Sequence, residues 1–290
     1  MALNSIAEIL AEVKETGTPF WEIVLQNDME DRQVSREASI AKMLTTWQAM
    51  QDAADSYTGT RRSVSGLVGG DGMKMRQYNR RGESFSGSYI SDVIAEALSM
   101  AESNACMRRI VAAPTAGSCG VMPAVLLPLI RATDLTQRQI LEALYVACGV
   151  GIVIAKRACI AGASGGCQAE IGTASAMAAA ALVSLRGGTD DMIANAVAMA
   201  LSNLMGLVCD PIAGLVEVPC VKRNVIGAMD AVSAADMALA GIESYVPVDE
   251  VIDAMGEVGR HMPMEYRETA LGGLANTPTG RAVKEKMNQG

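Results

Sequence analysis

The apolar residues of this chain are mostly small, and this feature limits the folds that it can adopt. Half of the 290 residues are hydrophobic but only 3% are aromatic, and the chain holds 19 methionines and 28 glycines. Small side chains let helices approach one another closely. No segment alternates apolar and polar residues over six positions, as a half-buried strand would. The sequence therefore predicts an all-α fold of tightly packed, Ala- and Gly-rich helices.

Capping residues and apolar spacing locate the predicted helices. Ser5 and Glu8 form a capping box before an apolar run that ends at Gly17. Thr136 and Gln139 mark the start of a longer helix in the same way. Apolar residues at helical spacing predict the remaining helices, and the predicted helices lie at residues 5–17, 35–57, 91–105, 136–159, 168–185, 190–207, 221–240, 247–261 and 279–287. Pro19 opens a further turn or two, and another helix begins near Val121.

One segment is rich in helix-breaking residues. Five glycines fall within residues 58–72, and this composition favours a mobile surface loop over a loop that approaches a functional site. No linker-like stretch divides the chain. We therefore expect a single compact helical domain over residues 1–290, with peripheral N-terminal helices in 1–65 and a core that carries the motifs in 66–290.

Charge and hydropathy argue against nucleic-acid and membrane partners. The chain has 24 basic and 32 acidic residues, a net charge of −8, whereas nucleic acids and anionic membranes require a basic face. The apolar stretch 143–155 is shorter than the roughly 20 residues of a membrane-spanning helix. Residues 171–185 and 192–209 are rich in small residues and read as helices buried inside a soluble protein. Seven cysteines without an export signal indicate a reducing cytoplasm.

Three cysteines lie in turns between the predicted helices. Cys167, Cys209 and Cys220 occur in Gly-Gly-Cys-Gln, Cys-Asp-Pro and Val-Pro-Cys segments. Soft thiolate ligands suit iron–sulfur clusters. Three thiolates without an obvious fourth suit a cluster with one open iron, which can act as a Lewis acid. The alternatives are a structural zinc site, or cysteines that serve as small buried apolar residues.

A second candidate site is the segment Ala113–Gly120 (APTAGSCG), which precedes a predicted helix. Backbone N–H groups and the positive end of a helix dipole can hold a carboxylate or phosphate at such a turn. Gly117 and Gly120 permit close approach of a ligand, and Thr115 and Ser118 add hydroxyl groups. The alternative is an ordinary helix N-cap.

Further polar residues qualify as candidates by their position. Lys156 and Glu170 flank the Cys167 loop, where a lysine can bind a substrate carboxylate and a glutamate can accept a proton. Either could also be a solvated helix end. His261 is the only histidine, which excludes His-rich zinc sites and disfavours Ser–His or Cys–His triads. Cys119 is a fourth thiol candidate. No Walker-type or Gly-x-Gly-x-x-Gly loop supports nucleotide binding.

Four motifs in this order resemble those of the iron–sulfur L-serine dehydratases, and most closely the separate alpha subunit of the two-subunit type. The resemblance covers most of the chain from about residue 66 onward, and its four motifs lie at residues 113–125, 162–177, 207–223 and 266–275. The resemblance implies an all-helical catalytic domain. It also implies a [4Fe–4S] cluster held by Cys167, Cys209 and Cys220.

The resemblance further implies a lyase that converts L-serine to pyruvate and ammonia. The open iron would make the serine hydroxyl a better leaving group, and the Thr115–Gly120 loop, with Lys156, would hold the carboxylate. A separate beta subunit should supply a Ser-Ser-His-Thr-type motif that this chain lacks. The general base is not assigned, and roles for Ser164, Glu170 and His261 are left open.

The chain departs from the family pattern at two places. It ends in Asn288-Gln289-Gly290, without the terminal cysteine of single-chain relatives, so water or substrate should complete the fourth iron. Ser164 stands where an acidic residue is expected, and no acid–base role is assigned to it. Two alternatives to the serine dehydratase remain: a cluster-dependent cysteine desulfidase, and a non-enzymatic helical subunit with a structural metal. The pyridoxal phosphate route is disfavoured, because no Ser-x-Lys motif precedes a Gly-rich loop.

Overall fold

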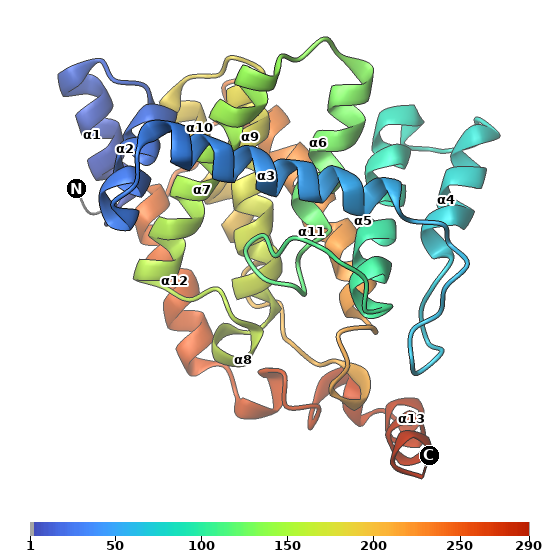
Figure 1. The fold of residues 1–290 in the computed structure, drawn as a ribbon. Coiled ribbons are helices and arrows are strands. Elements are labelled where there is room, and N and C mark those ends of the chain that lie inside the picture. Colours follow the sequence, from blue (N-terminus) through green and yellow to red (C-terminus); the bar gives the residue numbers. More distant parts are fainter. Residues whose placement is uncertain (1–2, 290) are drawn as a thin grey trace.

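The computed structural model describes residues 3–289 and confirms the all-α prediction, since helices and loops without a strand make up this range (Figure 1). An isolated parallel bridge pairs Cys209 with Arg267. In chain order, the α-helices are α1 (Ile6–Thr16), α2 (Phe20–Arg32), α3 (Arg36–Asp55), α4 (Asp71–Arg80), α5 (Gly87–Ala105), α6 (Val121–Ala132), α7 (Gln137–Arg157), α8 (Gly162–Gly165), α9 (Thr173–Leu185), α10 (Asp190–Leu204), α11 (Cys220–Leu239), α12 (Val248–His261) and α13 (Pro278–Asn288). Short π or 3-10 turns are η1 (Gln168–Gly172), η2 (Ile212–Gly214), η3 (Met264–Tyr266) and η4 (Gly273–Asn276).

Helix α9 lies at the centre of the protein, with α7, α10 and α11 packed around it (Figure 1). Every residue of α9 except Ser184 is buried. Glycines on neighbouring helices make this packing possible. A Cβ atom at Gly151 of α7 would lie 2.9 Å from the sulfur of Met177, and one at Gly227 of α11 would lie 2.8 Å from Ile171 Cγ2. Glycines therefore lie where the central helices come closest to one another, and a larger residue would not fit there.

The N-terminal helices join the same core. Val24 of α2 packs so closely on α7 that a Cβ at Gly149 would lie 2.5 Å from its Cγ2. Asp249 of α12 accepts hydrogen bonds from the backbone N–H groups of Ile6 and Ala7, at 2.9 Å each. The first helix is thus capped by a side chain from near the other end of the chain.

Several segments differ from the sequence-based expectation. Helix α4 forms where no helix was predicted, and α2 is longer than the turn or two expected after Pro19. Residues 168–185 are not one α-helix, because η1 forms a π-helical turn before α9 begins. The Gly-rich segment 58–72 is not a loose surface loop. Its Ser63 is buried and donates a hydrogen bond to Glu217 Oε2 at 2.7 Å, three residues before Cys220. The segment therefore approaches the candidate site, because serine side chains anchor it where composition alone indicated mobility.

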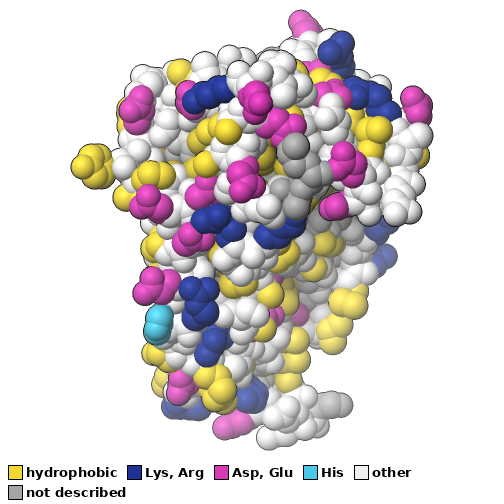
Figure 2. Space-filling view, turned by 90° about the vertical axis from the view of Figure 1, so that its left-hand side faces the viewer, with side chains coloured by type: hydrophobic (Ala, Val, Ile, Leu, Met, Phe, Trp, Pro, Cys, Tyr) yellow, Lys and Arg dark blue, Asp and Glu magenta, His cyan; other side chains and the backbone are white. Residues whose placement is uncertain are grey.

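Within the described residues, α7 is long and apolar enough to cross a membrane by length and composition. Other elements bury 61% of its most apolar stretch, as they would a core helix of a soluble protein. On the face shown in Figure 2, acidic and basic side chains are interspersed.

Candidate functional site

The candidate site begins at Cys167, which directly precedes the π-helical turn η1. The short helix α8 leads into it through Gly166, whose φ of +76° favours glycine. A Cβ at Gly166 would lie 2.7 Å from the sulfur of Met262 and 2.9 Å from the carbonyl oxygen of Leu207. Both the backbone conformation and the close packing therefore require glycine next to this cysteine.

Gln168 holds the Cys209 loop against the Cys167 loop. Its backbone N–H donates to the Leu207 carbonyl at 2.9 Å, and its side-chain oxygen accepts from the Gly206 N–H at 2.7 Å. Its side-chain amide also donates to the Met255 carbonyl of α12 at 3.1 Å. This buried glutamine fixes the position of the segment that carries the second cysteine.

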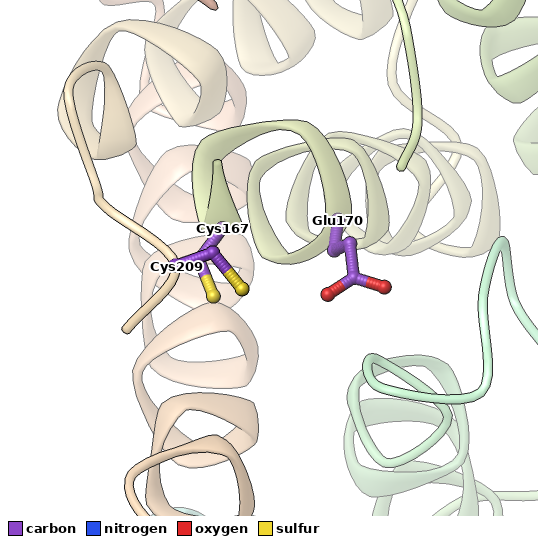
Figure 3. Close-up of side chains that lie close together, drawn as sticks. All are labelled: Cys167, Glu170 and Cys209. Atoms are coloured by element: carbon purple, nitrogen blue, oxygen red, sulfur yellow. The ribbon is translucent and has the colours of Figure 1, made fainter. Parts of the chain in front are cut away.

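These contacts bring two thiols and a carboxylate together. The Sγ atoms of Cys167 and Cys209 and a carboxylate oxygen of Glu170 all lie within 4.8 Å of one another (Figure 3). Arg223 of α11 donates to Cys167 Sγ at 3.4 Å and to Asp210 at 2.7 Å. A positive charge therefore lies directly beside the sulfur pair.

The surroundings shift the acidities of these groups. The hydrogen bond from the Cys209 thiol lowers the pKa of Cys167, burial opposes this, and the Arg223 charge adds to the lowering. The pKa of Cys209 is raised, because its thiol donates to Cys167 and is itself buried. Burial raises the pKa of Glu170, a hydrogen bond with Thr115 opposes it, and the charge of the nearby Glu268 raises it further.

The C-terminal segment covers this group from another side. The Cys209 N–H donates to the Tyr266 carbonyl, and the Glu268 N–H donates to the Cys209 carbonyl, both at 2.8 Å. A Cβ at Gly162 would lie 3.1 Å from Cys209 Sγ, 3.1 Å from a Glu170 oxygen and 3.3 Å from a Glu268 oxygen. Gly162 therefore faces all three functional groups, and its lack of a side chain keeps the space between them open.

Cys220, the first residue of α11, lies outside the group of atoms within 4.8 Å but interacts with it electrostatically. Burial raises its pKa to about 12, and the charge of Cys167 adds to this. One helical turn later, the buried Asn224 donates to the Cys220 carbonyl at 3.0 Å and to the Gly117 carbonyl at 2.8 Å. It also accepts from the Gly120 N–H at 2.9 Å. Asn224 thereby ties the predicted anion loop to the helix of the third cysteine.

The predicted anion loop meets the cysteine group at Glu170. Thr115 hydrogen-bonds to Glu170, and a Cβ at Gly117 would lie 3.1 Å from a Glu170 oxygen. The other two predicted residues brace the loop. Ser118 is buried with its hydroxyl 3.0 Å from Thr115 Oγ1, and the N–H of Gly120 is engaged by Asn224.

The structure does not bring the remaining candidates into this group. Lys156 is exposed in the last turn of α7 and forms no ion pair with any of residues 3–289. Ser164 is exposed in α8, and His261 is exposed at the end of α12, where its Nδ1 lies 3.0 Å from a carbonyl of its own helix. Cys119 is buried, and its burial raises the pKa of its thiol to about 12.

Four residues of the site were not assigned a role from the sequence: Gln168, Arg223, Asn224 and Glu268. Arg223 and Asn224 follow Cys220 by three and four residues on one helix, so helical spacing could have placed them beside it. Gln168 is adjacent to Cys167. No sequence signal places Glu268 near Cys209, because only the folded chain brings the C-terminal segment there.

The residues present fit a group that needs soft ligands. The three turn cysteines are all buried, and their thiols interact electrostatically: Cys167, Cys209 and Cys220. Arg223 donates a hydrogen bond to Cys167. The lack of a side chain at Gly162 leaves space next to Cys209 Sγ. Thiolates in such a setting bind iron–sulfur clusters or zinc.

Comparison with known proteins gives matches over nearly the whole chain. A family model described as "Serine dehydratase alpha chain" matches residues 15–275. The "Probable L-serine dehydratase, alpha chain" of Bacillus subtilis is 46% identical, over 98% of this chain and 95% of that protein. The "L-serine dehydratase, alpha chain" of Peptoniphilus asaccharolyticus is 43% identical, over 97% of each. The "L-serine dehydratase TdcG" of Escherichia coli is 35% identical over 94% of this chain but only 61% of its own length.

Proposed function

This chain belongs to the serine dehydratase alpha-chain family, and on that basis we propose that it converts L-serine to pyruvate and ammonia. The names of its relatives support the reaction. The proposal is further supported by a group in which buried thiols, the Glu170 carboxylate and the Thr115–Gly120 loop lie close to one another.

We assign a [4Fe–4S] cluster to Cys167, Cys209 and Cys220. Two observations support three ligands from this chain. Gln168 and Arg223 hold the Cys167 loop and the Cys209 loop together. Arg223 also lies on the first turn of α11, which begins at Cys220. When bound, the cluster would supply a Lewis acid that makes the substrate hydroxyl a better leaving group.

The Thr115–Gly120 segment is placed to hold the substrate carboxylate. It precedes α6, so the positive end of that helix dipole and the free N–H groups of residues 116–118 favour an anion. Ser118 and Gly120 would act indirectly, by fixing the loop through Thr115 and Asn224. The exposed Lys156 would act by attracting an anion from solvent.

Glu170 is the residue of this chain best placed to exchange a proton with bound substrate, because it contacts both the loop and the sulfur pair. In the reaction, the α-carbon loses a proton and the β-carbon loses its hydroxyl, which leaves as water. The resulting aminoacrylate tautomerises to an imine. Water then hydrolyses the imine to pyruvate and ammonia, so the net reaction consumes no water.

The name "alpha chain" of two relatives supports a separate beta chain as partner. The E. coli relative supports it too, because this chain matches only 61% of its length. We propose that the active enzyme contains both chains.

The observation that carries this proposal is the link through Asn224, which joins the carboxylate-type loop to the third cysteine. The test is metal, sulfide and product analysis of anaerobically purified protein, with its partner chain, given L-serine or L-cysteine. We expect about four irons and four sulfides per chain and pyruvate from serine. Zinc alone, or sulfide release from cysteine without pyruvate from serine, would overturn the proposal.

A further inference from the structure

Three arginines gather around a surface hollow that has no part in the proposed reaction. Arg61 comes from the segment that follows α3, and Arg108 and Arg109 come from the segment that follows α5. The hollow has a volume of about 380 Å³ and is also lined by Asp52, Ala53, Ser56 and Met107. Two chain segments far apart in the sequence therefore place positive charge in one concave site.

These arginines have no partner among the residues that the structure describes. Across residues 3–289, the guanidinium groups of Arg61, Arg108 and Arg109 form no ion pair and no hydrogen bond. A second hollow shows the usual arrangement, in which arginines face an equal number of carboxylates; it is lined by Arg76, Arg80, Arg131, Asp55, Asp92 and Glu96. The first hollow has one carboxylate, Asp52, for three arginines, in a chain whose net charge is −8. Positive charges that line one hollow repel each other, so a bound anion would stabilise this arrangement of three arginines.

Two buried polar atoms lie in a recess next to the hollow. Arg108 Nε and Ser103 Oγ are both buried and have no hydrogen-bond partner in the protein. Both residues line a recess of about 10 Å³, which shares Arg61 and Arg108 with the hollow. The buried Glu102 also lines this recess, and its carboxylate oxygens accept hydrogen bonds from the Tyr57 hydroxyl and the Asp71 N–H. Buried donors are normally satisfied, and leaving one unpaired is costly. A recess of this size holds about one oxygen atom or one water.

We propose that this hollow is a binding site for a small oxyanion, of the class of phosphate esters or polycarboxylates. A guanidinium group presents donors in a planar fork that matches two oxygens of a phosphate or carboxylate. Arg61 and Arg109 are exposed and would contact the ligand at the edge of the hollow. Arg108 would contact it from inside the protein, where its Nε is buried. One ligand oxygen would lie in the recess and satisfy Arg108 Nε and Ser103 Oγ.

The test is calorimetric titration of the full-length chain with inorganic pyrophosphate and, separately, with citrate. We expect saturable binding of one ligand per chain that weakens as ionic strength rises. Arg108→Gln and Arg61→Gln should each weaken binding by about tenfold or more. Arg108→Lys keeps the charge but lacks the fork, and should also weaken binding. Arg80→Gln, which removes an exposed arginine from the charge-balanced hollow, should bind as the unmodified chain does.

The two probes separate the ligand classes: pyrophosphate alone indicates phosphate esters, and citrate alone indicates polycarboxylates. Thermal unfolding of each variant shows whether it is folded, and Arg61→Gln, at an exposed position, tests the site should Arg108→Gln unfold. The proposal is overturned by absence of binding at millimolar concentrations, or by equal binding in Arg61→Gln, Arg108→Lys and the unmodified chain. It is also overturned by a crystal structure with pyrophosphate in which water alone occupies the hollow. Loss of binding when the partner chain is added would likewise refute it, because the partner would then fill the hollow.

Discussion

At the scale of single residues, local surroundings divide the cysteines into two kinds. The pKa of Cys167 is lowered by its hydrogen bond from Cys209 and by Arg223, whereas burial raises the pKa of Cys119 to about 12 and that of Cys148 to about 11. Thiolates are the form that binds metal. The pKa values of Cys209 and Cys220 are raised as well, so only the pKa of Cys167 stands apart. Position distinguishes the other two turn cysteines from Cys119 and Cys148, because Cys209 Sγ lies within 4.8 Å of Cys167 Sγ and Cys220 interacts electrostatically with Cys167.

Serine substitutions test the ligand assignment. Cys167→Ser, Cys209→Ser or Cys220→Ser should each abolish the visible absorbance and most of the iron of anaerobically purified protein, because a hydroxyl is a poor ligand for the cluster. Cys148→Ser should keep both, since this residue of α7 is packed against the apolar core and away from the turn cysteines. Full iron content in the Cys209 variant would remove that residue from the ligand set.

A glycine substitution tests the open space in the site. In Gly162→Ala the new methyl group would lie 3.1 Å from both Cys209 Sγ and Glu170, so we expect reduced iron content and a loss of activity of about tenfold or more. Gly172→Ala is the matched control, because its nearest neighbour atom is 3.8 Å away. That control should be neutral or stabilise the helix by about 0.5–1 kcal/mol. Unchanged iron content and activity in Gly162→Ala would show that the site tolerates a side chain there.

At the scale of elements, a cap from outside the helix holds α1 in place. Ser5 caps α1 from within the sequence by accepting from the Glu8 N–H at 3.0 Å, which confirms the N-cap half of the predicted capping box. Asp249 adds a second cap from α12, and Arg157 of α7 lies 3.8 Å from Asp249. Three helices thus meet at one carboxylate, and α1 depends on α12 for its position.

Removing this cap should loosen α1 without unfolding the core. Asp249→Ala leaves the Ile6 and Ala7 N–H groups without their acceptor, so we expect a loss of about 1–2 kcal/mol in the free energy of unfolding. Amide hydrogen exchange should become faster in α1 and stay unchanged in α9. Glu250→Ala, at the exposed neighbouring position, is the control and should change neither. Uniform acceleration across α1 and α9 would show that the cap contributes to global stability instead.

At the scale of the whole molecule, local patterns predicted the elements, and long-range contacts decided how the loops meet. Ser5, Thr136 and the apolar spacing placed helix ends to within a few residues, because caps and periodicity are local. The three cysteines in turns indicated a metal site because their residue type and flanking turn residues are also visible in the local sequence. The contacts of Gln168 and Asn224 join segments that lie far apart in the sequence, and no local pattern encodes them.

Activity should depend on a second chain. The E. coli relative is longer than its match to this chain, and apolar residues near Cys209 are exposed here: Met264 by 58%, Leu271 by 49% and Leu274 by 42%. Exposed apolar patches of this kind mark protein contacts. We expect the purified chain alone to produce little pyruvate from serine, and addition of the beta chain to restore turnover, measured under anaerobic conditions. The Cys209→Ser variant should bind the beta chain in a gel-filtration assay yet stay inactive, which separates assembly from chemistry. Full turnover by the chain alone would show that the site is complete without a partner.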